Sequence, residues 1–344
     1  MSKSSSKFRV RRHMLRVAPA ILMFSCLLVV ATGCAPELGA LFKLRTISQP
    51  SLPETADPSV VRMDSQFYIY GSNTDLRAPV TKTNDIDRQY TGSEKDSLTA
   101  EAMPTSPAWA ARPEQLWAPT VAQFGTRWVM FFGADRINPP QPHNAQCVGR
   151  AFAERPEGPF VPEPQPFNCG IGQVGGALDP EVTSDIQGNR YLLVAFSDTE
   201  APLHSIPLDA NANAVGPPVQ ILARQYGWEY HFIENPSMVY DSTRGNYLLT
   251  YSAGVWWQRD YSTGIARCSA PVGPCTSDPS GPWIASSAGR TGPGGLSFFT
   301  DTSGGARAIF STFAEGRETQ NGGRSASIMP LTLSPVVGLG PIVK

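Results

Sequence analysis

The chain has 344 residues and a formal net charge of −1, with 28 basic and 29 acidic side chains. Glycine (31 residues) and proline (32 residues) are abundant, and charged residues make up only 17% of the sequence. The chain therefore lacks the excess of basic side chains that nucleic-acid binding requires. Its many glycines and prolines favour a turn-rich β protein over a helical one.

Residues 1–33 have the pattern of a bacterial export signal. A basic head is followed by an apolar run over residues 17–32, which ends in small residues directly before Cys34. These three features are typical of a cleaved signal peptide, and small residues followed by cysteine resemble a lipobox. We predict that Cys34 becomes the lipidated N-terminus of an exported protein held at the membrane and facing outside. An ordinary signal peptide of a secreted protein, or an uncleaved anchor, is the alternative.

The rest of the chain repeats one pattern five times. Each copy starts with a proline-marked strand, continues through a polar turn and ends in a second strand rich in aromatic or β-branched residues. The prolines are Pro58, Pro119, Pro180, Pro236 and Pro293, at steps of 61, 61, 56 and 57 residues. The expected strand pairs are 57–61 with 67–70, 117–121 with 128–132, 179–182 with 191–194, 233–240 with 246–251, and 292–296 with 308–310.

A repeat of this length leaves room for two more strands in each copy. Four-stranded sheets repeated around an axis form a β-propeller, and each repeat then makes one blade. We therefore predict an all-β protein in which residues 53–344 form a five-bladed β-propeller with a central substrate channel. Residues 34–52 are predicted to be a tether.

Four cysteines lie within the predicted propeller: Cys147, Cys169, Cys268 and Cys275. An even number in an exported chain indicates disulfides, and four cysteines can pair in three ways. We favour Cys147–Cys169 and Cys268–Cys275, because the second pair closes a short local loop. A metal site is the alternative, but neither pair has the CxxC spacing of a zinc site.

Three acidic residues stand at the entry of the predicted innermost strands. Asp57 and Asp179 directly precede the proline of their repeats, and Glu234 lies one position earlier in its own. Asp before Pro is a common turn device, so one instance alone carries little weight. Because the innermost strands of a propeller share one axis, the three residues together are expected to direct carboxylates from three blades toward one end of the channel.

Four phrases occur in order, one per blade: Ala56-Asp57-Pro58-Ser59-Val60, Leu116-Trp117-Ala118-Pro119, Leu178-Asp179-Pro180-Glu181 and Ile233-Glu234-Asn235-Pro236. With these phrases the chain resembles the family 43 glycoside hydrolases of the five-bladed arabinanase-like clan, over about residues 56–331. The resemblance implies that Asp57 is the general base and Glu234 the general acid. It implies that Asp179 tunes the pKa of the acid and orients it.

Inverting hydrolysis of a glycoside explains the need for these carboxyl groups. One acid protonates the leaving oxygen, and one base activates water on the opposite face of the sugar. Carboxyl groups on different blades leave room for that water, whereas neighbours on one strand do not. A nearby carboxylate such as Asp179 would raise the pKa of Glu234 by repulsion. We therefore predict an ionised Asp57 and a protonated Glu234 near neutral pH.

Two positions depart from the family pattern. Asn235 follows the acid where relatives usually have a small residue, and we predict that Asn235 binds a sugar hydroxyl. In the fifth repeat many relatives have Gly-His, and the histidine helps to hold a central metal ion, but this chain has Gly292-Pro293-Gly294-Gly295. We therefore expect no metal ligands and no cofactor; a channel ion such as calcium is the alternative.

Three tryptophans are predicted to bind substrate. Trp117 belongs to the repeat itself, Trp228 lies shortly before the acid, and Trp256 follows the same strand pair. Indole rings offer flat, partly apolar faces that suit sugar rings. Packing between blades is the alternative for each of them.

The sequence thus predicts a monomeric, exported, inverting glycoside hydrolase that cleaves O-glycosyl bonds. The resemblance implies a furanose-containing polysaccharide as substrate, such as arabinan or an arabinose-substituted cell-wall glycan. The alternative is a non-catalytic carbohydrate-binding propeller on the cell surface. Asn235 and the missing histidine favour that alternative, whereas three carboxyl groups in register favour an enzyme, because binding alone needs no acid–base pair.

Overall fold

The computed structural model describes residues 51–140, 145–173, 176–197, 201–320 and 323–331, and the backbone of residues 336–337. The predicted signal at residues 1–33 and the lipidated Cys34 lie outside this part of the chain. Across the described ranges, no helix is long and apolar enough to cross a membrane.

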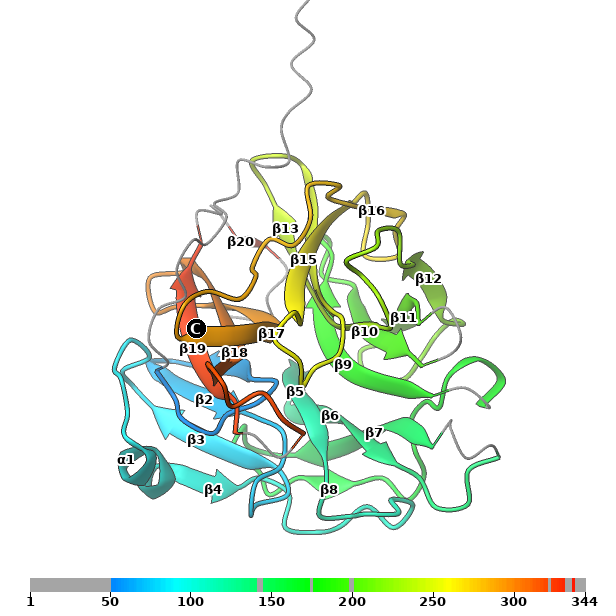
Figure 1. The fold of residues 1–344 in the computed structure, drawn as a ribbon. Coiled ribbons are helices and arrows are strands. Elements are labelled where there is room, and N and C mark those ends of the chain that lie inside the picture. The colour runs from blue at the N-terminus through cyan, green and yellow to red at the C-terminus, as the bar shows by residue number, and fades with distance from the viewer. Residues whose placement is uncertain are drawn as a thin grey trace, which may run out of the picture. The chain divides into compact units, whose positions relative to one another are not determined.

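Five antiparallel sheets account for the described strands (Figure 1). The first sheet holds β1 (Ser59–Met63), β2 (Gln66–Tyr70), β3 (Pro79–Thr83) and β4 (Thr99–Glu101), with α1 (Gly92–Ser97) before β4. The second holds β5 (Trp117–Phe124), β6 (Arg127–Asp135), β7 (Gln146–Ala153) and β8 (Val161–Pro162). The third holds β9 (Ala177–Ser184), β10 (Arg190–Phe196), β11 (Leu203–Leu208) and β12 (Val219–Leu222), and the short η2 (Ile171–Gln173) precedes it.

The last two sheets follow the same plan with small differences. The fourth holds β13 (Ile233–Asp241), β14 (Asn246–Ala253), β15 (Ser262–Cys268) and β16 (Cys275–Ser277), and β20 (Val336–Val337) pairs with β13. The fifth holds β17 (Arg290–Thr300), β18 (Ala306–Ala314) and β19 (Ser325–Pro330).

The first strands of the five sheets form a closed ring. β1 contacts β5, β5 contacts β9, β9 contacts β13, β13 contacts β17, and β17 contacts β1. The sheets therefore stand around one axis as five blades, and Figure 1 shows them in chain order from blue to red. The predicted five-bladed β-propeller is confirmed.

The start of the described chain completes the fifth blade. The backbone N–H of Ser51 donates to the carbonyl of Ala326 at 2.8 Å, and Ala326 donates to the carbonyl of Leu52 at 2.8 Å. Residues 51–52, which the sequence analysis assigned to the tether, therefore lie beside β19 in the fifth sheet. This pairing covers the edge that β19 would otherwise expose.

Hydrophobic side chains between neighbouring blades form the core. Tyr70, Met130 and Phe132 are fully buried in one cluster that joins the first two blades. Leu193 and Leu249 belong to another cluster that joins the third and fourth blades. Side chains alternate between the two faces of each strand, and every blade packs against a neighbouring blade on both faces. Both sets of side chains are therefore buried, which explains the nearly continuous apolar runs along β6 and β14.

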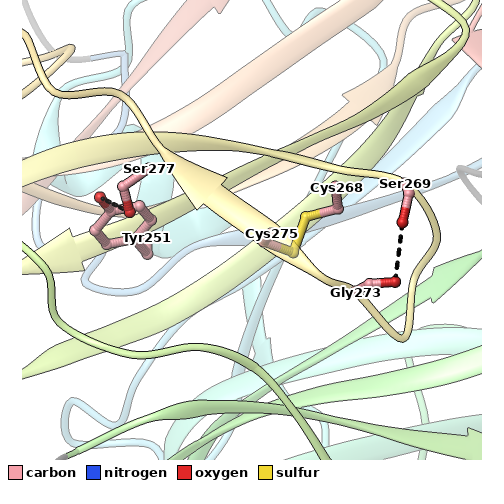
Figure 2. Close-up of a disulfide and its surroundings, with 6 residues drawn as sticks. All are labelled: Tyr251, Cys268, Ser269, Gly273, Cys275 and Ser277. Carbon is pink, nitrogen blue, oxygen red and sulfur yellow. Dashed lines mark hydrogen bonds between the residues drawn. A yellow bond between two sulfur atoms is a disulfide. The ribbon is translucent and has the colours of Figure 1, made fainter.

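Both predicted disulfides are present. They join Cys147 to Cys169 and Cys268 to Cys275. The first holds β7 to the segment after β8, and the second holds β15 to β16 (Figure 2). The cysteine pairings favoured from the sequence are confirmed.

Figure 2 shows how the second disulfide lies among the hydrogen bonds of the fourth blade. In the loop between β15 and β16, Ser269 Oγ donates to the carbonyl of Gly273 at 3.1 Å. On the other side, Tyr251 Oη of β14 lies 3.0 Å from Ser277 Oγ of β16. The outer strands of this blade are therefore joined by one covalent bond and by side-chain hydrogen bonds.

Candidate active site

The residue before the repeated proline has the same unusual backbone conformation in every blade. The φ angles are 43° at Asp57, 43° at Ala118, 51° at Asp179, 47° at Asn235 and 59° at Gly292. Residues other than glycine rarely adopt positive φ, and such strain persists only where the surrounding structure imposes it. The strand pairing breaks register at this place in β5, β9, β13 and β17. Each break is a bulge that redirects a side chain at the entry of an inner strand.

These bulges surround a small cavity on the propeller axis. Its volume is about 20 Å³, and residues of all five inner strands line it. Asp57, Asp179 and Asn235 are among the lining residues. The predicted convergence of carboxyl groups from separate blades is thus observed for Asp57 and Asp179, and Glu234 is the residue next to Asn235.

Asp57 is held by hydrogen bonds that link the first two blades. Ser72 Oγ donates to Asp57 Oδ2 at 2.6 Å. Ser72 Oγ in turn accepts the backbone N–H of Ala118 at 3.0 Å, which directs the hydroxyl proton toward the carboxylate. The arrangement presents Asp57 as a fixed hydrogen-bond acceptor at the end of the channel.

Asp179 is a buried carboxyl group close to the other two acids. Its side chain is 7% exposed, and Oδ2 accepts the backbone N–H of Asn235 at 3.1 Å. Burial raises the pKa of Asp179 well above its ordinary value, and the charges of Glu234 and Asp57 raise it further. Asp179 therefore favours its neutral form beside its two neighbours.

Glu234 has the pKa expected of a general acid. Burial is the main factor that raises the pKa of Glu234 to about 7, and the charge of Asp57 also raises it. The hydrogen bond that Tyr261 can donate to the Glu234 carboxylate, and the charge of Arg324, act in the opposite direction. The pKa of Glu234 was predicted to be raised by the charge of Asp179. In the structure burial and Asp57 have this effect, and the pKa of Asp179 is itself raised.

Arg324 is a buried cation close to these acids. Its guanidinium donates to the carbonyls of Gly292 at 2.7 Å and Trp256 at 3.0 Å, and to Ser311 Oγ at 2.9 Å. Its side chain also covers one face of the Tyr261 ring, 5.4 Å from the ring centroid. The charge of Arg324 acts on Asp57 and Glu234. No local sequence pattern marks Arg324, because its contacts come from three separate segments of the chain.

Glu181 is a further acid that lines the axial cavity, and sequence reasoning did not select it. It accepts hydrogen bonds from Ser297 Oγ at 2.9 Å and from Ser237 Oγ at 3.5 Å, and burial raises its pKa to about 7. Ser59, Glu181 and Ser297 also line a larger cavity of about 80 Å³. The signal that could have found Glu181 is its place directly after the proline of the third repeat.

The predicted tryptophans have different environments. Trp228 stacks on Tyr251 with ring centroids 6.0 Å apart and packs against the cluster between the third and fourth blades. Trp117 begins β5, is partly buried and lies 5.9 Å from the Arg112 guanidinium. Trp256 is 36% exposed, and its carbonyl is bound by Arg324. Of the three, Trp256 is therefore the one that is exposed and whose carbonyl is bound by Arg324. Sugar binding by all three stays a prediction.

The carboxyl groups of this site do not form a protein cage for a metal ion. In the ranges that the structure describes, no group of three or more His, Cys, Asp or Glu side chains has a metal-binding arrangement. A Cβ atom at Gly295 would lie 2.8 Å from Asp57 Oδ1, so this part of the fifth blade accepts no side chain without displacing that carboxylate.

Comparison with known proteins agrees with this arrangement. The pattern of the glycosyl hydrolases family 43 matches residues 48–335. Xylosidase/arabinosidase 43A of Humicola insolens is 29% identical over 150 residues, which are 40% of this chain and 42% of that protein. The chain thus spans less than half the length of this curated relative.

Solved structures share the fold. A thermostable family-43 glycoside hydrolase superposes with a TM-score of 0.70 at 20% identity, covering 87% of this chain and 97% of the other. The α-L-arabinofuranosidase of Lactobacillus brevis has a TM-score of 0.68 at 17% identity, covering 82% and 92% of the two chains. At these identities the likeness establishes the propeller fold.

Proposed function

Because the chain belongs to glycosyl hydrolases family 43, we propose that it is an inverting glycoside hydrolase with Glu234 as general acid and Asp57 as general base. The observation that carries this proposal is the difference between the two acids. Glu234 has a pKa of about 7 and so keeps its proton up to near neutral pH, whereas Asp57 accepts a short hydrogen bond from Ser72. The two residues belong to different blades of one ring, as an acid and a base on opposite faces of a sugar require.

Each side chain has a distinct step in the proposed reaction. Glu234 transfers its proton to the leaving glycosidic oxygen as the bond to the anomeric carbon breaks. Asp57 takes a proton from the water that attacks the same carbon from the opposite face, and the product has inverted configuration. Asp179 binds the backbone N–H next to Glu234 and so orients the acid. Asn235 and Trp256 are proposed to contact the sugar.

The proposed substrates are furanose-containing polysaccharides, such as arabinan or arabinose-substituted cell-wall glycans. The names of the xylosidase/arabinosidase relative and of the arabinofuranosidase with the same fold support this class. The exposed Trp256 and Phe232 at 36% and 41% exposure offer flat apolar faces to sugar rings.

The experiment that tests the function is a substrate panel with analysis of product stereochemistry. Aryl arabinofuranosides, aryl xylosides and arabinan oligomers are incubated with the full chain, and proton NMR follows the first anomer released. Hydrolysis that releases the inverted anomer supports the proposal. Hydrolysis with retained configuration rejects the roles of Asp57 and Glu234, and sugar binding without hydrolysis establishes a carbohydrate-binding propeller instead.

We also propose that the protein is exported and anchored by a lipid at Cys34. The signal-like sequence of residues 1–33 supports this proposal, as do two disulfides, which persist in oxidising compartments. Metabolic labelling with a fatty acid tests it in a bacterial host, with Cys34→Ala beside the natural chain. Label on the natural chain alone supports the anchor, and no label on either chain rejects it.

A further inference from the structure

The hydroxyl of Tyr261 touches two oxygen atoms but has one proton. Tyr261 is 2% exposed and lies just before β15. Its Oη is 2.7 Å from Glu234 Oε1 and 2.8 Å from Asn235 Oδ1, both hydrogen-bond distances. A phenol donates one hydrogen bond, and an amide oxygen only accepts, so the second contact needs a proton from Glu234.

The ionised and the protonated forms of Glu234 supply different numbers of protons to these contacts. When Glu234 is ionised, its carboxylate and the Asn235 oxygen compete for the one proton of Tyr261, and one of the two oxygen pairs has no hydrogen between them. When Glu234 is protonated, it donates to Tyr261 Oη, and Tyr261 donates to Asn235 Oδ1. Every contact is then a hydrogen bond.

We propose that Tyr261 and Asn235 form a relay that holds the proton on Glu234: Asn235 binds the Tyr261 proton, and Tyr261 Oη accepts the proton of Glu234. Tyr261 and Asn235 are thus positioning residues that act through the acid. The inference rests on the proposed function only in that Glu234 is the general acid; the relay itself is a property of the free protein.

The members of the relay are held in place from several sides. A Cβ atom at Gly294 would lie 2.2 Å from the Tyr261 ring, so glycine is needed for the ring to take this position. Arg324 covers the ring at 5.4 Å from its centroid. Asn235 is anchored by its backbone N–H on Asp179. The phenol and the amide therefore have little freedom to turn away from one another.

The charged groups around Glu234 show why the relay matters. Asp57 from the first blade and the buried Asp179 from the third face it, and Arg324 approaches from the end of the fifth. The charge of Arg324 favours the ionised form of Glu234, and so would a hydrogen bond donated by Tyr261. By binding the Tyr261 proton, Asn235 removes the second of these effects.

The replacement Asn235→Ala tests the relay. Ala118 occupies the same position of the second repeat with φ of 43°, so alanine is compatible with this backbone. Without the amide oxygen, Tyr261 is free to donate to the Glu234 carboxylate. We expect the pKa of Glu234 to fall by about 0.5–1 pH unit, the equivalent of one ordinary hydrogen bond. Carbon-13 NMR of the labelled full chain measures it, with the signal of Glu234 identified by its loss in Glu234→Gln.

A double-mutant cycle with Tyr261→Phe tests whether Asn235 acts on Glu234 through Tyr261. In the Tyr261→Phe background, Asn235→Ala has no phenol to release and is expected to leave the pKa of Glu234 unchanged. Asn235→Gly is a second form of the test, because Gly292 takes the same position of the fifth repeat with φ of 59°. An unchanged or raised pKa in Asn235→Ala overturns the relay, and so does an equal fall in both backgrounds.

The titration needs no substrate, so the two proposals fail separately. A protein that hydrolyses no glycoside but shows the fall in Asn235→Ala retains the relay and loses the proposed function. A protein that hydrolyses glycosides and shows no fall retains the function and loses the relay.

Discussion

Gly295 stands directly against the carboxylate of Asp57: a methyl group on its α-carbon would lie 2.8 Å from Oδ1. Gly295 also has φ of 62°, in the left-handed region where glycine is favoured. The fifth blade therefore sets the position of the proposed base on the first blade. An added side chain would meet a charged oxygen and the backbone of Asp57 rather than open space.

We expect Gly295→Ala to lower kcat by about 100-fold, because a displacement of the base by about 1 Å has an effect of that size. Gly125→Ala is the matched control. Gly125 has φ of 60°, and no atom lies within 4 Å of an added Cβ, so it carries the same backbone strain without the collision. Rates of hydrolysis and thermal unfolding of both variants measure the difference. Equal losses of activity in the two would show that backbone strain, not Asp57, is responsible.

Arg324 offers a way to separate charge from hydrogen bonding. Its charge lowers the pKa of Glu234, so Arg324→Met is expected to raise that pKa. Because the acid must be protonated, the fall of kcat/KM at high pH then begins at a higher pH. Arg324→Lys keeps the charge and loses the fork of bonds to Gly292, Trp256 and Ser311, so its profile is expected to keep the natural limb.

Both Arg324 variants are expected to lose about 2–3 kcal/mol of free energy of unfolding, because they leave buried carbonyl groups unpaired. Urea unfolding at one pH measures this loss, and the pH dependence of kcat/KM measures the charge effect. A limb that moves equally in the methionine and lysine variants would show that the charge of Arg324 does not act on the acid.

The fold could be predicted from the sequence because the five prolines repeat at nearly constant steps. A residue must keep its position in the inner strand of its repeat in order to lie at the axis. The same repeat predicted the three acids of the site, Asp57, Asp179 and Glu234. The positive φ angles at these positions were not visible, because an X-Pro pair usually favours an extended residue before the proline.

Other features depended on contacts between distant segments. Tyr261 lies 27 residues after Glu234 and touches it only because β15 pairs with β14, which in turn pairs with β13. Arg324 reaches carbonyls of two segments that precede it by 32 and 68 residues. No local pattern marks either residue. The pairings of cysteines were predictable because Cys268 and Cys275 are close in the chain.

Glu181 is expected to make stability depend on pH. Burial raises its pKa from 4.5 to about 7, so the folded chain keeps a proton that the unfolded chain releases between these values. Stability is therefore expected to fall as pH rises through this window and to level off above it. Glu181→Gln removes this contribution, and it should gain about 1–3 kcal/mol over the natural chain at pH 8 relative to pH 5.

Urea unfolding at pH 5 and pH 8 measures this difference. The exposed Glu114→Gln is the matched control, because it makes the same chemical change outside the channel. If Glu181→Gln and Glu114→Gln respond equally to pH, the buried carboxyl group is not the source.

Truncation should lower stability at Trp228 and substrate affinity at Trp256. Trp228 packs on Tyr251 inside a blade interface, so Trp228→Ala is expected to cost about 3–5 kcal/mol of stability. Trp256 is exposed, so Trp256→Ala is expected to unfold at nearly the natural temperature and to raise KM for oligosaccharides more than for aryl monosaccharides. Unfolding curves and kinetics of both variants test this, and a KM unchanged for every substrate would remove Trp256 from the proposed binding surface.

Glu234 is proposed to donate the proton to the leaving group. The most direct measurement compares Glu234→Gln with the natural chain on two glycosides of the same sugar: a dinitrophenyl glycoside, whose leaving group needs little protonation, and the natural linkage, which needs it. We predict a loss of kcat/KM of about 100-fold or more on the natural linkage and a much smaller loss on the dinitrophenyl glycoside. Equal losses on both, or no loss on either, would contradict the assignment.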